Sequence, residues 1–301
     1  MMSGTPSLLW GEEMRVRRVP KDHLSTLCQS PWYNTRRHPY VEGNIAYVPV
    51  RDEYNAELEL PERKPYHNRG YYQIGDLILF HGPRPSPEEL EAVIFWTHPR
   101  GVLWVRCLSE VTRMPDCELL YGECGEVCHI ENGYRYWLDP SRIMFAQGNR
   151  EERARMGALV RLGERAGDLC AGIGYFTLPM ARAGARVHAI ELNPLAYQFL
   201  LRNAKENGVE DRVQAECGDC RTLLSGIYDR LVIGHFDMLP LLAGALRYVH
   251  EGSVLHLHTI DPCEAEIRST VKGAGFSPTM AIHRVKKYAP GRWHVVWDVT
   301  L

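Results

Sequence analysis

The second half of the chain alternates short apolar runs that fit β-strands with longer amphipathic runs that fit helices, and this alternation restricts the possible folds more than any other feature. Strands joined through helices lie parallel, so the pattern predicts a parallel sheet with helices on both faces. The predicted strands are residues 168–171, 186–191, 212–217, 229–234 and 253–260. The predicted helices are residues 175–183, 193–207, 236–249 and 263–274.

Two further predicted strands, residues 279–287 and 292–300, end the chain. The connection Tyr288-Ala-Pro-Gly291 is a turn sequence, so we expect an antiparallel hairpin at one edge of the sheet. Five parallel strands closed by such a hairpin are typical of the class I S-adenosylmethionine-dependent transferases, an α/β class with a Rossmann-like sheet. We therefore expect this fold, preceded by smaller α+β domains.

The stretch from Asp168 to Pro179 predicts a buried strand that runs into a glycine turn and then into a helix. Gly172 and Gly174 lie in the turn, where the missing Cβ atoms let a ligand approach the main chain. The N–H groups that open the helix lack partners and can bind an anionic or strongly polar group. The turn is therefore the first candidate for a nucleotide-type site.

Acidic residues follow the next two predicted strands. Glu191 ends the first, at about the interval where a carboxylate accepts hydrogen bonds from a ribose diol in doubly wound sheets. Asp219 follows the second strand at the same edge. Thr177 stands where the dinucleotide fingerprint has its third glycine. This departure favours S-adenosylmethionine, which has no pyrophosphate to bind, over a nicotinamide or flavin dinucleotide.

Three domains are expected: an amino-terminal segment over residues 1–65, a small α+β middle domain over 66–147 and the catalytic domain over 148–301. The first segment is irregular in pattern and interleaves basic with aromatic residues. This composition suits contact with a nucleic acid, but equally a small α+β segment whose aromatic side chains form its own core. The middle segment predicts a mixed sheet with one helix.

A helix capped by Asn149 and running to about Leu162 is expected at the start of the catalytic domain. It carries Arg150, Arg153 and Arg155, for which two interpretations remain open. The arginines either face solvent with local glutamates as partners, or one of them holds the carboxylate of a ligand.

The composition excludes some classes of protein. With 35 Lys and Arg against 37 Asp and Glu, the chain is not a uniformly basic nucleic-acid binder, although a local basic face is possible. No apolar run approaches the roughly 20 residues that span a bilayer, and the first residues lack the apolar core of a signal peptide. We expect a cytoplasmic protein without a membrane partner. The nine cysteines show no complete zinc-site spacing, so no metal is expected.

Eight segments, in their order along the chain, resemble one family. The segments are IGDLILF, IMFAQGNREERARM, DLCAGIGYFTLP, AIELNPLAY, ECGDCR, YDRLVIGHF, LHLHT and VKKYAPGRWHVVWDV. Together they resemble the archaeal and eukaryotic wybutosine-synthesising tRNA aminocarboxypropyltransferases and, more distantly, the sister tRNA guanine-37 N1-methyltransferases. The resemblance runs from about residue 70 to the end of the chain.

The resemblance implies transfer of the 3-amino-3-carboxypropyl group of S-adenosylmethionine to C7 of 4-demethylwyosine at position 37 of tRNA-Phe, with release of methylthioadenosine. It implies that Glu191 holds the ribose hydroxyls, that Asp219 and Cys220 hold the adenine edge, and that Arg153 lies near the methionyl carboxylate. Relatives usually have Ser in place of Ala146 and often Asn in place of Cys220, so their side-chain contacts are not carried over there. The full expected cofactor set is Arg153, Asp168, Gly172, Gly174, Tyr175, Phe176, Glu191, Leu192, Asn193, Asp219, Cys220 and Gly234.

The exit of the fourth predicted strand favours aminocarboxypropyl transfer. It reads Ile233-Gly-His-Phe236 and lacks the Asn-Pro signature of the methyltransferases. The N1-methyltransferase reaction on the same tRNA remains the first alternative, and a non-catalytic tRNA-binding protein the second. A dinucleotide oxidoreductase is disfavoured by the missing third glycine.

Catalytic residues are harder to predict, because the electron-rich base is itself the nucleophile and positioning with desolvation could suffice. His235, His256 and His258 are candidates to accept the C7 proton or to bind the base, and pocket lining or structural hydrogen bonding is an equal alternative for each. A monomer is favoured. The candidate tRNA contacts, expected to meet phosphates, are Lys286, Lys287, Tyr288 and Arg292.

Overall fold

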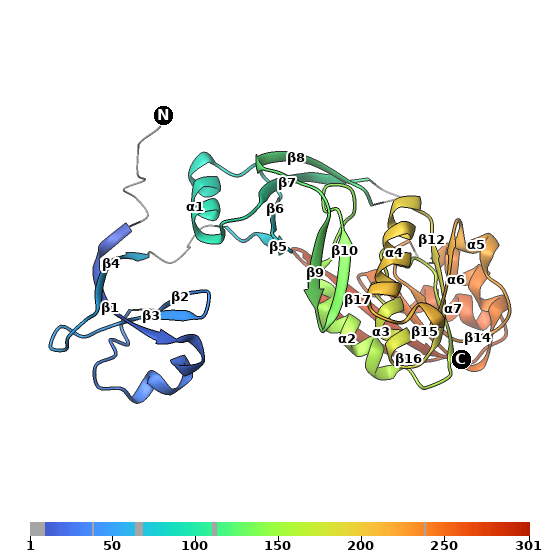
Figure 1. Cartoon of the computed structure of the whole chain (residues 1–301). Helices are drawn as coiled ribbons and strands as arrows, with labels where there is room; N and C mark the ends of the chain where they lie inside the picture. Colours follow the sequence, from blue (N-terminus) through green and yellow to red (C-terminus); the bar gives the residue numbers. More distant parts are fainter. Residues whose placement is uncertain (1–9, 38, 64–68, 110–112, 238) are drawn as a thin grey trace. The chain divides into compact units, whose positions relative to one another are not determined.

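The computed structural model describes residues 10–37, 39–63, 69–109, 113–237 and 239–301 (Figure 1). The chain divides into two compact units. The first comprises Met1–Arg69 together with Pro87–His98, and the second comprises Gly70–Ser86 together with Pro99–Leu301. None of the helices in the described ranges is long and apolar enough to cross a membrane.

The second unit is organised around a seven-stranded sheet with the strand order β13-β12-β11-β14-β15-β17-β16. The strands from β13 to β15 run parallel, and β17 pairs antiparallel with both β15 and β16. This arrangement confirms the class I α/β fold and its terminal hairpin. The strands are β11 (Arg165–Asp168), β12 (Arg186–Glu191), β13 (Val213–Cys217), β14 (Tyr228–Ile233), β15 (Val249–Ile260), β16 (Thr279–Ala289) and β17 (Arg292–Thr300).

Helices cover both faces of this sheet, as predicted. A first buried cluster, which includes Met156 and Leu200, packs α2, α3 and α4 against one face. A second buried cluster, which includes Leu242 and Val271, packs α5, α6 and α7 against the other. The helices are α2 (Arg150–Leu159), α3 (Thr177–Arg182), α4 (Pro194–Glu206), α5 (Cys220–Leu223), α6 (Leu239–Ala245) and α7 (Glu264–Gly273), with 3₁₀ turns η2 (Gln147–Asn149), η3 (Glu210–Arg212) and η4 (Leu246–Tyr248).

The glycine turn starts earlier than predicted. The strand predicted at residues 168–171 is wrong, because β11 ends at Asp168 and the chain turns directly after it. Gly172 and Gly174 adopt φ angles of 58° and 100°, which residues with a Cβ rarely adopt. The extended backbone of β11 therefore does not continue through these positions. The following helix begins at Thr177 rather than at residue 175.

The accuracy of the other helix predictions depends on local stop and start signals. The helix predicted over residues 236–249 is shorter than expected, since α6 covers only Leu239–Ala245 and passes into a 3₁₀ turn. The helix predicted over residues 193–207 is confirmed as α4. There the Asn193 side chain caps the helix by accepting a hydrogen bond from the Leu195 N–H group at 3.0 Å.

Two small sheets complete the second unit. One is four-stranded with the order β5-β6-β7-β8, and the other is the β9–β10 hairpin. The side chain of Asn203 on α4 fixes the hairpin, because it accepts from the N–H group of Trp137 and donates to the carbonyl of the same residue. The edge strand β8 was not predicted, since all of its residues are exposed or only partly buried. The strands are β5 (Tyr72–Ile74), β6 (Leu77–His81), β7 (Gly101–Leu108), β8 (Pro115–Gly122), β9 (Val127–Glu131) and β10 (Tyr134–Leu138).

The first unit is more regular than its sequence pattern indicates. It contains a four-stranded antiparallel sheet with the order β2-β3-β1-β4, and inward residues such as Val16 and Val48 are fully buried. The rings of Tyr40 and Tyr47 stack with their centroids 4.7 Å apart, so aromatic residues do pack within this unit. Residues 1–9, 38 and 64–68 lie outside the described residues. The elements are β1 (Trp10–Pro20), η1 (Lys21–Gln29), β2 (Tyr40–Glu42), β3 (Ile45–Pro49), β4 (Leu58–Arg63) and α1 (Pro87–Thr97).

Candidate active site

A cavity of about 710 Å³ lies at the carboxyl ends of the parallel strands. Doubly wound sheets bind their ligands at this edge, where strand ends, glycine turns and helix starts meet. Most of the residues expected at the site line the cavity, namely Arg153, Gly172, Tyr175, Phe176, Glu191, Leu192, Asn193, Asp219, Cys220, Gly234, His235, His258, Lys286, Lys287 and Tyr288. Four others, Asp168, Gly174, His256 and Arg292, lie outside its wall.

Asp168 and Gly174 support the glycine turn from behind. Asp168 is fully buried and accepts a hydrogen bond from the Thr177 hydroxyl at 2.7 Å, and burial raises the pKa of this carboxyl group to about 7. A Cβ at residue 174 would meet the side chains of Leu178 and Leu200 at 3.1 and 3.2 Å. Both residues therefore shape the turn without facing the cavity.

His256 and Arg292 are each engaged elsewhere. His256 is fully buried, with Nδ1 2.6 Å from a carboxylate oxygen of Asp298 and Nε2 2.6 Å from the Arg230 guanidinium. Its two ring nitrogens are thus occupied. Arg292 forms an ion pair with Asp261 at 2.9 Å.

Glu191 is held rigidly at the end of β12. Its carboxylate accepts hydrogen bonds from the backbone N–H groups of Gly172 and Asn193, each at 2.7 Å. Burial raises the pKa of Glu191, and the hydrogen bonds from the main chain partly oppose that rise. A Cβ at residue 172 would meet the ring of Tyr175 at 2.7 Å, so glycine permits the close approach. The remaining lone pairs of the carboxylate can accept hydrogen bonds from a diol.

Asp219 differs from Glu191, although it follows the neighbouring strand β13. It caps α5 by accepting the N–H group of Arg221 at 2.9 Å, and it also accepts from the guanidinium of that residue at 2.9 Å. This pairing lowers the pKa of Asp219. Arg221 was not predicted as a site residue, although its place two residues after the acid is visible in the sequence. Cys220, between them, is buried and lines the cavity.

Arg153 is buried, with 1% of its surface exposed, so its open interpretation as a solvated residue is wrong. Its Nε donates to Glu131 at 2.7 Å, and its Nη1 donates to the carbonyl oxygen of Ala146 at 3.1 Å. Nη2 lies 2.7 Å from the same Glu131 oxygen but is not aligned for a hydrogen bond, which leaves it without a hydrogen-bond partner among the described residues. Glu131 comes from the β9–β10 hairpin, and no local pattern connects it with α2.

His258 and His294 form a buried pair in the cavity wall. Nδ1 of His258 lies 2.9 Å from Nε2 of His294, and both residues are 1% exposed. Their outer ring nitrogens have no partner among the residues that the structure describes. Burial lowers the pKa of both rings, that of His294 to about 4 with a contribution from the nearby charge of Lys286. When both rings are neutral, one of them donates its single N–H group to the inner nitrogen of the other. The outer nitrogen of the donating ring then carries no hydrogen and is a free acceptor. His294 was not predicted.

Basic and aromatic residues of β16 also line the cavity. Lys286 is half-buried, and its pKa is lowered by burial and by the charges of neighbouring arginines, whereas Lys287 and Tyr288 are exposed. The ring of Tyr288 lies 5.6 Å from that of Phe236, over which the Arg113 guanidinium lies at 5.5 Å. Arg113 and Phe236 were not predicted as site residues.

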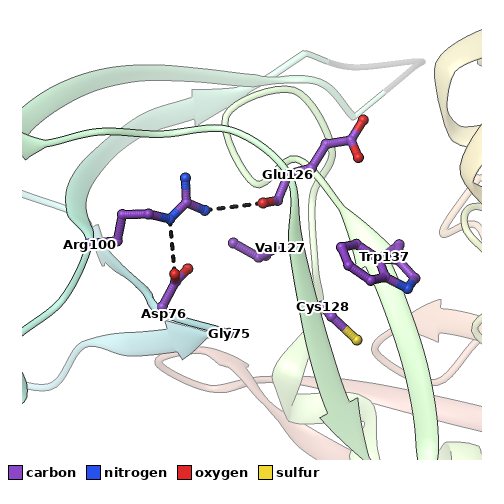
Figure 2. A pocket seen from close by; sticks show the side chains of 7 residues that line it. All are labelled: Gly75, Asp76, Arg100, Glu126, Val127, Cys128 and Trp137. Carbon is purple, nitrogen blue, oxygen red and sulfur yellow. Dashed lines mark hydrogen bonds and ion pairs between the residues drawn. The ribbon is translucent and has the colours of Figure 1, made fainter.

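A second hollow, of about 420 Å³, lies between β5 and the β9–β10 hairpin (Figure 2). Its charged groups are already paired. Arg100 donates to the Asp76 carboxylate at 2.9 Å and to the main-chain carbonyl of Glu126 at 3.1 Å. A Cβ at Gly75 would meet Val127 at 2.9 Å. These contacts join two sheets. The carboxylate of Glu126 is also paired, with Arg202 at 2.6 Å, whereas the ring nitrogen of Trp137 has no hydrogen-bond partner among the described residues.

Known proteins identify the family. Residues 127–276 match the TRM5/TYW2 methyltransferase domain. A curated relative from Pyrococcus horikoshii is 34% identical over 267 residues, which cover 83% of this chain and 95% of the relative. This chain belongs to the TRM5/TYW2 family. A relative from Methanocaldococcus jannaschii is 30% identical and covers 76% of this chain and 96% of its own length. Both relatives are named tRNA(Phe) (4-demethylwyosine(37)-C(7)) aminocarboxypropyltransferase.

Solved structures of the TRM5/TYW2 family share the fold. TYW2 from P. horikoshii in complex with MeSAdo has a TM-score of 0.67 at 31% identity, covering 77% of this chain and 90% of that chain. The M. jannaschii tRNA m1G37 methyltransferase has a TM-score of 0.69 at 24% identity, which shows a common fold alone. The match to the family domain includes Arg153 and Glu191 but ends at residue 276. Lys286 and His294 therefore lie beyond it.

Proposed function

We propose that this member of the TRM5/TYW2 family transfers the 3-amino-3-carboxypropyl group of S-adenosylmethionine to C7 of 4-demethylwyosine at position 37 of tRNA-Phe, in the cytoplasm, and releases methylthioadenosine. The observation that carries the proposal is the 34% identity along 95% of the P. horikoshii aminocarboxypropyltransferase. The exit of β14, Ile233-Gly-His-Phe236, lacks the Asn-Pro signature expected of an N1-methyltransferase and supports the same choice.

The residues of the cavity suit S-adenosylmethionine. Glu191 has lone pairs left for the ribose hydroxyls, and Gly172 leaves room for the ligand beside the main chain. Asp219 and the main chain of Cys220 would lie at the adenine edge, with Arg221 balancing the charge of Asp219. The buried Nη2 of Arg153, which lacks a hydrogen-bond partner among the described residues, suits a carboxylate.

When bound, S-adenosylmethionine supplies a sulfonium with three neighbouring carbons open to attack. Which group is transferred depends on which carbon lies in line with C7 of the base, at a near-attack distance of about 3–3.5 Å. In this proposal Arg153 orients the methionyl chain, because it is held in place by Glu131 on one side and by the Ala146 carbonyl on the other. The protein needs no nucleophile of its own.

Transfer replaces the hydrogen on C7 by a carbon chain, so a base must accept the C7 proton. Of the three predicted histidines, we assign this role to His258. It lines the cavity, it is neutral, and together with His294 it offers an unpaired ring nitrogen. His256 is occupied by Asp298 and Arg230. His235 also lines the cavity, and we assign it to contact with the nucleobase of the tRNA.

The tRNA is proposed to bind over the exposed part of the cavity rim. Lys287 and Tyr288 are exposed there, and the nearby Arg113 and Phe236 offer a cation and a flat ring to an unstacked base. The proposed partner is therefore an unstacked anticodon-loop purine with its flanking phosphates.

The test is a double-label assay with tRNA-Phe that carries 4-demethylwyosine. One sample of S-adenosylmethionine is labelled in the carboxypropyl chain, and the other in the methyl group. The proposal requires label in the RNA from the first sample only, together with methylthioadenosine. Label from the methyl sample only would establish the N1-methyltransferase reaction instead. No label from either, with tRNA still bound, would leave a tRNA-binding protein.

A further inference from the structure

Lys286 has a position that differs from that of the exposed basic residues around it. It lines the cavity and is half-buried, and it forms no ion pair with any carboxylate among the described residues. The charges that act on Lys286 are those of Arg153 and Arg113, which have the same sign as the lysine. A half-buried ammonium group beside two guanidinium groups is costly unless an anion joins them.

Gly148 makes the position of Lys286 possible. A Cβ at residue 148 would lie 2.5 Å from Cδ of Lys286 and 3.1 Å from its Nζ. The lysine stem therefore lies against the main chain of η2, the turn that leads into α2, and β16 and η2 are in contact. This packing directs the amine along the wall that also carries Arg153, which follows η2 on α2.

The charges around Lys286 are not balanced by the protein. Glu131 neutralises Arg153, which leaves Lys286 and Arg113 without a carboxylate partner in the described part of the wall. Among the acids that line the cavity, Glu191 is bound by main-chain N–H groups and Asp219 is paired with Arg221. Asp237 is 91% exposed and lies 4.0 Å from His235. Lys286 and Arg113 are thus two cations that an anionic ligand could balance, at least in part.

We propose that Lys286 binds the carboxylate of the methionyl chain of S-adenosylmethionine, together with Nη2 of Arg153, rather than a tRNA phosphate. This inference rests on the proposed function, since it takes that molecule as the ligand. Two observations support it independently. Nη2 of the buried Arg153 lacks a hydrogen-bond partner among the described residues, and the half-buried Lys286, packed against Gly148, has no carboxylate partner there. A phosphate of the tRNA would be met by the exposed Lys287 instead.

The test measures binding by calorimetry with three probes: S-adenosylmethionine, decarboxylated S-adenosylmethionine and methylthioadenosine. Only the first carries the carboxylate. Lys286→Met should weaken its binding by about 10- to 100-fold and leave the other two unchanged, since an ion-paired hydrogen bond is lost. Lys286→Arg should restore most of the affinity. Lys272→Met, which removes an exposed charge from α7, is the matched control and should change none of the three.

A second variant tests the same inference without removing any charge. Gly148→Ala places a methyl group where Lys286 now lies, and the φ angle of Gly148 is not in the glycine-only region. Gly148→Ala should weaken the binding of S-adenosylmethionine by roughly 3- to 10-fold and leave the binding of the two probes that lack the carboxylate unchanged.

The outcomes separate the inference from the proposed function. Equal weakening of all three probes by Lys286→Met would overturn the inference and make the lysine a structural residue. Unchanged binding of all three, with a lower salt dependence of tRNA binding, would overturn it in favour of a phosphate contact. If the unmodified protein binds none of the probes, the proposed function fails, and the inference fails with it.

Discussion

Two walls of the cavity are built in different ways. The acidic wall, Glu191 and Asp219, is held mainly by N–H groups near the strand ends that carry these acids. The basic wall, Arg153, Lys286 and His294, draws its residues from α2, β16 and β17. In the proposed function, the first wall would face the part that S-adenosylmethionine and methylthioadenosine share, and the second would face the transferred chain. The difference teaches that holding the nucleoside and choosing the transferred group are separable tasks.

Of the changes considered, the loss of Arg153 from the basic wall should have the largest effect on the free energy of unfolding. Arg153→Ala leaves Glu131, whose side chain is 6% exposed, as a buried carboxylate without its partner. We expect a loss of about 3–5 kcal/mol in the free energy of unfolding, because a buried charge left uncompensated is strongly destabilising. Urea unfolding followed by circular dichroism measures this loss.

Two variants control the Arg153 experiment. Arg268→Ala removes an exposed ion pair with Glu264 on α7 and should cost no more than about 1 kcal/mol. The double change Arg153→Met with Glu131→Leu should recover most of the stability, since it removes both charges. If Arg153→Ala alone costs as little as Arg268→Ala, the buried pair does not hold the wall together.

Acid should weaken the basic wall through His294. The folded state holds the pKa of His294 at about 4, below its usual 6.5, so the unfolded chain binds more protons between these two values. The stability contributed by the neutral ring is complete above pH 6.5 and is lost as the pH falls towards 4. The lowering of the His294 pKa from 6.5 to about 4 corresponds to at most about 3.4 kcal/mol. Urea midpoints between pH 7.5 and 4.5 measure it.

Single histidine variants isolate this contribution. His294→Gln should flatten the fall in stability between pH 6.5 and 4.5. His250→Gln should do the opposite, because a carbonyl of Glu251 and the Asp229 carboxylate raise the pKa of His250, and its stabilising effect is present at low pH. An identical pH dependence in all three proteins would mean that neither ring differs from its unfolded state.

Changes in the acidic wall should weaken the binding of S-adenosylmethionine and of methylthioadenosine equally. In Glu191→Gln the amide NH₂ group faces one of the N–H donors of Gly172 and Asn193, and two donors cannot form a hydrogen bond. We expect the hydrogen bond from this side chain to the ribose to weaken as well. We expect affinity for S-adenosylmethionine and for methylthioadenosine to fall by the same factor, about 30-fold or 2 kcal/mol. Asp219→Asn, at the part-exposed acid, should cost less than about 5-fold. Calorimetry that finds loss for one nucleoside only would contradict the division between the walls.

The acidic wall could be predicted from the sequence because its signals are local. A strand that ends in Glu191, a glycine turn at Gly172 and a cap at Asn193 lie within one βαβ unit, and the structure joins all three through the hydrogen bonds of the Glu191 carboxylate. What the sequence could not show is that Asp219, in the equivalent place one strand later, is part-exposed and paired with Arg221.

The basic wall could be predicted only in part, because its contacts join distant segments. Arg153 was a candidate, but Glu131 lies in a separate hairpin. Lys286 and Lys287 read alike in the sequence, yet only Lys286 is half-buried, against Gly148. His294 became visible only when β17 paired with β15 and brought it to His258. Such residues are specified by the assembled sheet rather than by any short pattern.

Ligands with and without the carboxylate should also differ in how they change the pKa of His294. This is the smallest effect that we expect. The charge of Lys286 helps to lower the pKa of His294. A bound carboxylate would neutralise that charge, so S-adenosylhomocysteine, which carries the same chain but cannot react, should raise the pKa of His294 by up to about one unit, or 1.4 kcal/mol. Methylthioadenosine lacks the chain and its carboxylate, so it should leave this pKa nearly unchanged. Nuclear magnetic resonance titration of the imidazole measures both, and in Lys286→Met the two ligands should give the same value. An equal rise with both ligands in the unmodified protein would mean that the carboxylate does not cause the change in the pKa of His294.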